Sequence, residues 1–140
     1  MSKSRARMLM VAFRVAFGLL FLLPGLNYFV PMFSEPAEPK AALSLVSAME
    51  ATGYMLPLLR VTEIFAGALL VAGTLVPLGL IILAPVVVNI FAFHLFLSPQ
   101  YTPLALFICA LELLLAWQHR RAFSPLFSIG DRADGDRGLM

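Results

Sequence analysis

A run of 20 residues without Asp, Glu, Lys or Arg sets the class of this protein: residues 78–97 read LGLIILAPVVVNIFAFHLFL. About 20 consecutive apolar residues cross the hydrocarbon core of a bilayer as an α-helix. Only helices and closed barrels satisfy their backbone in lipid, and barrel strands alternate apolar and polar residues over about 10 positions. An unbroken run of this length therefore predicts a transmembrane helix.

Three further apolar runs of similar length stand before and after it, at residues 8–29, 56–76 and 102–118. The chain of 140 residues is 61% hydrophobic and 13% charged, whereas an ordinary soluble domain carries about 25% charged residues. This composition excludes a soluble globule, and its high hydrophobicity excludes a disordered chain. The sequence predicts an all-α membrane protein: a four-transmembrane-helix bundle forming one domain over residues 1–127, followed by a polar tail at 128–140.

The segment between the first two runs has two parts. Residues 30–40 contain three prolines and predict an irregular loop. Residues 41–52 read AALSLVSAMEAT, with apolar residues at helical spacing, and Gly53 follows as a C-cap. Because about 12 residues are too few to span a bilayer, we expect an amphipathic interfacial helix that lies at the outer surface or caps the bundle.

The positive charges predict the orientation. Lys3, Arg5 and Arg7 precede the first run, and Arg120 and Arg121 follow the fourth, while the turns near residues 74–79 and 98–101 carry no charge. Lys and Arg in short flanks mark the cytoplasmic side. Four spans with both basic ends on one side are self-consistent, so we expect both termini and the tail in the cytoplasm.

The same charge pattern excludes several functions. The net charge of +2 resides at the flanks of membrane segments, so no basic stripe for nucleic acid exists and no nucleic-acid partner is expected. A single cysteine, Cys109, excludes a self-contained disulfide relay. No cluster of His, Cys and carboxylates has metal-ligand spacing. His94 and His119 are expected at opposite membrane faces, so they are not axial ligands of one haem.

Two ionisable residues are expected at one depth near the cytoplasmic side. Arg14 and Glu112 each lie roughly 10 Å inside the ends of their spans, by the rise per helical residue. Their charges are opposite, and a buried pair would offset both desolvation penalties. The sequence therefore predicts an Arg14–Glu112 ion pair with a structural role.

A second polar group is expected near the outer face. Arg60 and Glu63 share a helix face at i and i+3, and Asn27 and His94 lie within about a turn of the outer ends of their spans. Asn89 lies deeper and does not share a face with His94. These five residues are the candidate ligand-binding residues, for a small polar ligand or a quinone headgroup. The alternative is a hydrogen-bond network that fixes helix register.

With these elements placed, the sequence resembles the DoxX family of small bacterial membrane proteins. The resemblance rests on the order and spacing of four strings: GLLFLLPGLN at 18–27, ATGY at 51–54, ExxxGxLLxxG at 63–73 and APxxxNxxxFHL at 84–95. It covers most of residues 8–125. It implies a four-helix protein of the bacterial inner (plasma) membrane. The orientation predicted from the positive charges then places the first loop in the periplasm. Some relatives are small subunits of thiosulfate–quinone oxidoreductases, and others are membrane partners of soluble redox enzymes.

Three functions follow as hypotheses. The first is an accessory or quinone-linked membrane subunit of a redox system. Its candidate cofactor is a quinone and its partner a soluble or membrane redox enzyme, since no self-contained catalytic or redox centre is visible in the sequence. The second is a small proton-coupled transporter that acts as a homo-oligomer and uses Glu63. The third is a structural interaction protein whose small residues pack helices in the lipid bilayer.

Overall fold

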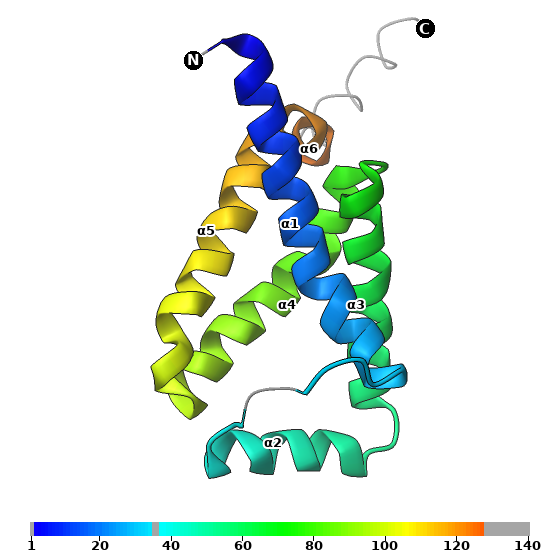
Figure 1. The fold of residues 1–140 in the computed structure, drawn as a ribbon, viewed down its shortest axis with the longest axis vertical. Helices are drawn as coiled ribbons and strands as arrows, with labels where there is room; N and C mark the ends of the chain where they lie inside the picture. Colours follow the sequence, from blue (N-terminus) through cyan, green and yellow to red (C-terminus); the bar gives the residue numbers. More distant parts are fainter. Residues whose placement is uncertain (1, 35–36, 128–140) are drawn as a thin grey trace, which may run out of the picture.

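In the computed structural model, the described residues, 2–34 and 37–127, form helices joined by short loops (Figure 1). The elements in chain order are α1 (Lys3–Phe29), α2 (Lys40–Ala51), α3 (Met55–Ala72), α4 (Val76–Leu97), the short 3-10 helix η1 (Pro99–Tyr101), α5 (Thr102–Gln118) and α6 (Arg120–Phe127). Four helical segments, α1, α3, α4 and η1 with α5, are long and apolar enough to cross a membrane. The predicted four-helix membrane bundle is confirmed.

Local chemistry sets the helix ends. Ser2 caps α1, because its Oγ accepts the backbone N–H of Arg5 at 3.4 Å, and the helix therefore begins five residues before the predicted span. α3 ends at Ala72, earlier than predicted, because Gly73 takes the left-handed conformation with φ of 74°. Its N–H bonds the carbonyls of Leu69 and Leu70, which closes the helix end.

The helices form a closed ring around an apolar core: α1 packs on α3, α3 on α4, α4 on α5, and α5 returns to α1. Phe17 and Phe21 of α1 meet edge to face, with ring centroids 5.2 Å apart. They join fully buried Leu70, Leu83 and Leu115 from the other three helices. Because lipid is as apolar as these side chains, close packing holds such a bundle together in a membrane rather than exclusion of water.

A glycine seam, made by Gly18, Gly25 and Gly67, brings α1 and α3 close together. A Cβ on Gly67 would lie 2.7 Å from the carbonyl oxygen of Gly18, and one on Gly25 would lie 2.7 Å from Ile64 Cγ1. Both distances are shorter than real Cβ contacts, and at Gly67 the contacted atom is backbone, so the two helices can approach this closely only with glycine at that position. The seam extends along α1 to the carbonyl of Arg60, 3.1 Å from a Cβ on Gly25.

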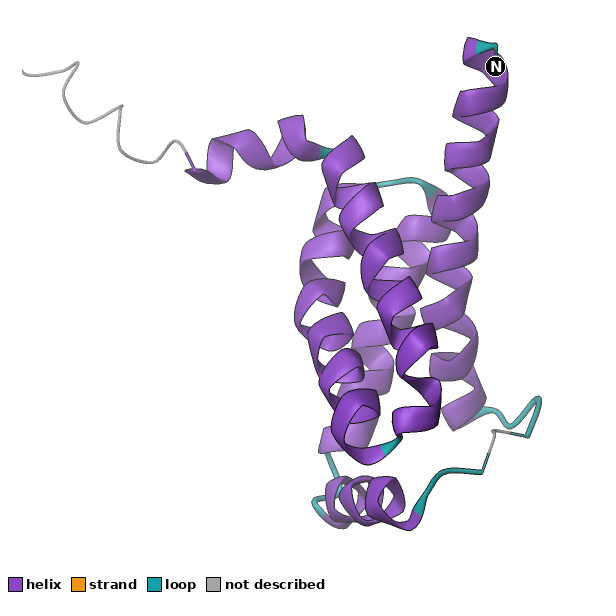
Figure 2. Ribbon diagram, turned by 90° about the vertical axis from the view of Figure 1, so that its left-hand side faces the viewer, coloured by secondary structure: helices purple, strands orange, loops and turns teal. Residues whose placement is uncertain are grey.

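α2 lies across one end of the bundle, against the ends of α3 and α4 (Figures 1 and 2). Ala42 is fully buried there, and Val46 and Met49 share its face and are half-buried. The loop before α2 is tied to the end of α4, because the Ser98 hydroxyl donates to Glu38 Oε2 at 2.9 Å. Of the two expected placements, α2 therefore adopts the one that caps the bundle.

The sequence did not lead us to expect α6. This helix leaves the bundle sideways at the end opposite α2, where the N-terminus of α1 also lies (Figure 2). The predicted tail at 128–140 lies outside the described residues.

The outer surface of the bundle is apolar. Large apolar side chains stay exposed on every spanning helix, among them Phe65 on α3, Val88 and Phe96 on α4, and Leu113 on α5. A soluble protein rarely exposes contiguous apolar surface on this scale. The chain is an integral, multi-pass membrane protein whose apolar helices contact the lipid bilayer.

Candidate functional site

Arg60 and Glu63 form an ion pair in the α2-proximal part of α3. Arg60 Nη1 lies 2.9 Å from Glu63 Oε2, a contact that their i and i+3 spacing allows. The Glu63 side chain is 6% exposed and that of Arg60 is 22% exposed. A pair placed this deep loses most of its hydration, so each charge depends on its partner. Arg60 Nε is buried and has no hydrogen-bond acceptor among the described residues.

The glycine seam holds this turn of α3 in place. Gly25 of α1 packs against the Arg60 carbonyl and Ile64, which fixes the backbone from which both charged side chains project. Glu63 lies eight residues from the first residue of α3, or roughly 12 Å along the helix. The pair is therefore held well inside the spanning segment.

Asn27, a candidate ligand-binding residue, bonds the backbone of the loop after α1. Its Oδ1 accepts the backbone N–H groups of Met32 at 2.7 Å and Phe33 at 2.9 Å. Its Nδ2 donates to the Phe33 carbonyl at 3.1 Å. These three bonds fasten the loop after α1 onto its last turn, so the amide is occupied by backbone.

His94 lies at the junction of α4, η1 and α5. Its Nδ1 is 2.9 Å from the Ile90 carbonyl, which can only accept, so this nitrogen carries the proton. The ring meets Phe93 and Tyr101 edge to face, at centroid distances of 5.3 and 6.1 Å. No hydrogen bond among the described residues joins His94 to Arg60.

Asn89 is exposed on α4, directly before the half-buried stretch that leads to His94. Within the described part of the chain, its side chain has no hydrogen bond. An amide that faces hydrocarbon is costly without a partner. The five candidates therefore do not form one site. Arg60 and Glu63 form an ion pair, and Asn27 holds the loop after α1. His94 lies where α4 meets α5, and Asn89 is exposed on α4.

The structure does not bring Arg14 and Glu112 together. Arg60–Glu63 is the ion pair found among the described residues, and neither Arg14 nor Glu112 takes part in one. Glu112 is buried in α5 at 8% exposure, and its Oε1 has no hydrogen-bond partner there. Arg14 instead projects toward Gly73, where its Nη2 would lie 2.7 Å from an added Cβ. Arg14 does not reach Glu112 because the glycine seam fixes the face of α1 that packs on α3. Arg14 lies on that face and therefore points toward the end of α3.

Sequence reasoning also missed a group of basic residues around Arg14. Arg7 and Arg14 are seven residues apart and so share a helix face, and they lie across a cavity from His119. The spacing was visible in the sequence, but the proximity of His119 depends on how α1 and α5 pack.

Among the described residues, no group of three or more His, Cys, Asp or Glu side chains could hold a metal ion. Comparisons with family models, curated proteins and solved structures found no match to this chain.

Proposed function

We propose that the protein is a membrane subunit of a redox system that binds a quinone beside Arg60 and Glu63. The observation that carries this proposal is Arg60 Nε, a buried donor without an acceptor, next to a buried carboxylate in a spanning helix. Ionisable residues in a membrane are costly and usually serve function. The resemblance to the DoxX family supports the same assignment.

The donor set fits a quinone headgroup. A quinone bound there would supply two-electron redox chemistry between its carbonyl and hydroxyl forms. Arg60 would donate its Nε–H to a carbonyl oxygen, and the Glu63 carboxylate would accept from a hydroxyl. The electrons come from a partner redox enzyme, soluble or membrane-bound.

The proposed orientation has both termini in the cytoplasm of a bacterial inner membrane. Lys3, Arg5 and Arg7 on α1 and Arg120 and Arg121 on α6 belong to the end of the bundle opposite α2 (Figure 1). Positive charge gathered at one end favours that end as the cytoplasmic one. The quinone would then bind in the outer half of the membrane.

The test uses Arg60→Lys, which keeps the charge opposite Glu63 but removes the Nε donor. We expect the melting temperature to stay close to that of the wild type and the affinity for a quinone analogue to fall about tenfold or more, because a buried charged hydrogen bond is lost. Glu63→Gln should lower the same affinity. Glu50→Gln on the exposed face of α2 is the matched control and should change neither quantity.

A structural pair would behave differently. In that case Glu63→Gln would lower the melting temperature, Arg60→Gln combined with Glu63→Gln would restore it, and analogue binding would be absent or unchanged in every variant. This outcome would remove the redox proposal and favour a structural interaction protein.

The second candidate function, a proton-coupled transporter acting as a homo-oligomer, is favoured by the exposed amide of Asn89. Asparagine side chains in spanning helices pair across helix interfaces, and an amide can both donate to and accept from its copy. This candidate predicts proton uptake into vesicles that depends on Glu63 and proceeds without an electron donor.

A further inference from the structure

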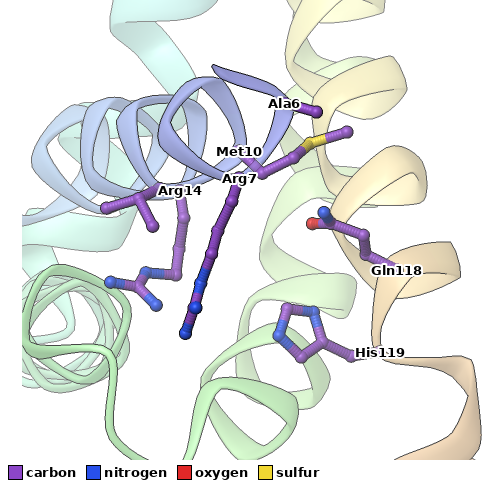
Figure 3. A pocket seen from close by; sticks show the side chains of 7 residues that line it. Ala6, Arg7, Met10, Arg14, Gln118 and His119 are labelled. Atoms are coloured by element: carbon purple, nitrogen blue, oxygen red, sulfur yellow. The ribbon is translucent and has the colours of Figure 1, made fainter. Parts of the chain in front are cut away.

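A basic cavity lies at the end of the bundle opposite α2, between the N-terminal half of α1 and the end of α5 (Figure 3). Its volume is about 470 Å³. The lining residues are Ala6, Arg7, Met10, Val11, Arg14, Gln118 and His119. None of them is acidic, so the cavity carries two guanidinium charges without a carboxylate to balance them.

Arg14 forms the deepest basic group of this cavity. Its guanidinium lies against Gly73, at the C-terminal end of α3, where the helix dipole is negative. That contact offsets part of its charge, but its Nε is buried and has no acceptor among the described residues. A buried donor without a partner is costly, which favours an acceptor supplied from outside the chain.

The other polar groups surround the same space. Arg7 lies two turns before Arg14 on the same face of α1, and Figure 3 shows both side chains projecting to one side of the helix. Gln118 and His119 face them from the end of α5. His119 Nδ1 is 2.8 Å from the Leu115 carbonyl and so carries a proton. Its Nε2 is then the ring nitrogen left for a ligand.

We infer that this cavity binds a phosphate group through Arg7, Arg14 and His119. Guanidinium groups pair with phosphate through two parallel hydrogen bonds, and phosphate offers enough acceptor oxygens for both guanidinium groups of the cavity. The cavity lies where α1 and α5 reach the basic membrane face, at which lipid headgroups are found, and basic pockets between spanning helices bind anionic headgroups there. The phosphate belongs to an anionic lipid or to a free phosphate ion. This inference does not depend on the proposed quinone site.

The experiment measures the melting temperature of the full chain in a neutral detergent during three titrations. The added compounds are phosphatidylglycerol, phosphatidylcholine and inorganic phosphate. For the lipid arm, native mass spectrometry counts bound lipid directly. We expect phosphatidylglycerol or inorganic phosphate to stabilise the protein in a saturable manner and phosphatidylcholine to have a much smaller effect. Saturation by phosphatidylglycerol alone assigns the site to a lipid headgroup, and saturation by inorganic phosphate assigns it to the free ion.

Two variants of exposed arginines test whether the phosphate binds in this cavity, and neither substitution is expected to disturb the fold. Arg7→Gln removes an exposed cavity residue, and Arg5→Gln removes an exposed arginine of the same helix that does not line the cavity. We expect Arg7→Gln to raise the concentration needed for half-maximal stabilisation about tenfold and Arg5→Gln to leave it nearly unchanged. His119→Gln should weaken binding as well.

The inference is overturned if neither phosphatidylglycerol nor phosphate stabilises the wild type. It is equally overturned if Arg5→Gln and Arg7→Gln weaken binding to the same degree, because general attraction to the basic end would then explain the effect. Neither result would change what the test of quinone binding at Arg60 shows.

Discussion

At the scale of single residues, Gly73 combines two constraints that a side chain would violate. Its φ of 74° lies in the left-handed region, and an added Cβ would lie 2.7 Å from Arg14 Nη2. Gly53 has nearly the same φ, 75°, with nothing within 4 Å of an added Cβ. Substitution at Gly53 would therefore introduce backbone strain alone, whereas substitution at Gly73 would introduce the same strain and also disturb the contact with Arg14.

We expect Gly73→Ala to destabilise the protein more than Gly53→Ala does. Both changes cost about 1–2 kcal/mol of left-handed strain, but only Gly73→Ala also displaces the guanidinium from the end of α3. The melting temperatures of the two variants in the same detergent give the comparison. Equal losses would mean that Arg14 moves aside freely and gains nothing from its place beside α3.

At the scale of elements, the contact of α1 with α3 depends on backbone approaching backbone. A Cβ on Gly67 would meet the Gly18 carbonyl at 2.7 Å and the Leu22 nitrogen at 2.8 Å, neither of which can rotate away. A Cβ on Gly79 would instead meet the Ala66 carbonyl at 3.2 Å, a contact that small shifts relieve.

Gly67→Ala should therefore lower stability by about 1–3 kcal/mol, because the helices must separate. Alanine favours a helix over glycine by up to about 1 kcal/mol, which reduces this loss but does not cancel it. For Gly79→Ala the same gain should nearly balance the milder contact. Unfolding in a denaturing detergent measures both variants, and a neutral Gly67→Ala would show that α1 and α3 are not held by this seam.

At the scale of the whole molecule, four spans place the described ends of the chain on one side and α2 on the other (Figure 2). A reporter that is active only outside the cytoplasm should be silent when fused after Gln118 and active when inserted after Gly53. The reason is the gathering of Lys and Arg at the end that bears α6. Parallel expression measurements control for unequal protein levels. Activity after Gln118 with silence after Gly53 would reverse the orientation and place the Arg60–Glu63 pair in the inner half of the membrane.

Much of the architecture was predictable because it depends on local properties of the chain. Apolar runs long enough to span a bilayer identify helices regardless of their neighbours, and the 102–118 segment begins and ends where predicted. The Arg60–Glu63 pair was predictable for the same reason, since residues at i and i+3 meet within one helix.

The partners of the other polar residues were not predictable from helix spacing. Asn27 bonds loop residues five and six positions ahead, in a segment whose path the sequence did not specify. Arg14 and Glu112 matched in depth and charge, but depth alone does not specify which neighbour a helix face turns toward. α6 was missed because it is only eight residues long and contains Pro125, a residue that usually ends a helix.

Local chemistry in the sequence thus accounts for the membrane class, the four spans, the short helix α2 and the ion pair within α3, while the placement of α2 across the end of the bundle required the structure. The arrangement of α1 against α3 and α5 required the tertiary structure, because it depends on where Gly18, Gly25 and Gly67 let two backbones meet. The orientation of α1 about its own axis places Arg14 beside Gly73 and leaves the basic cavity next to His119. Apolar periodicity carries little information about such rotations, since in lipid nearly every face of a spanning helix is apolar.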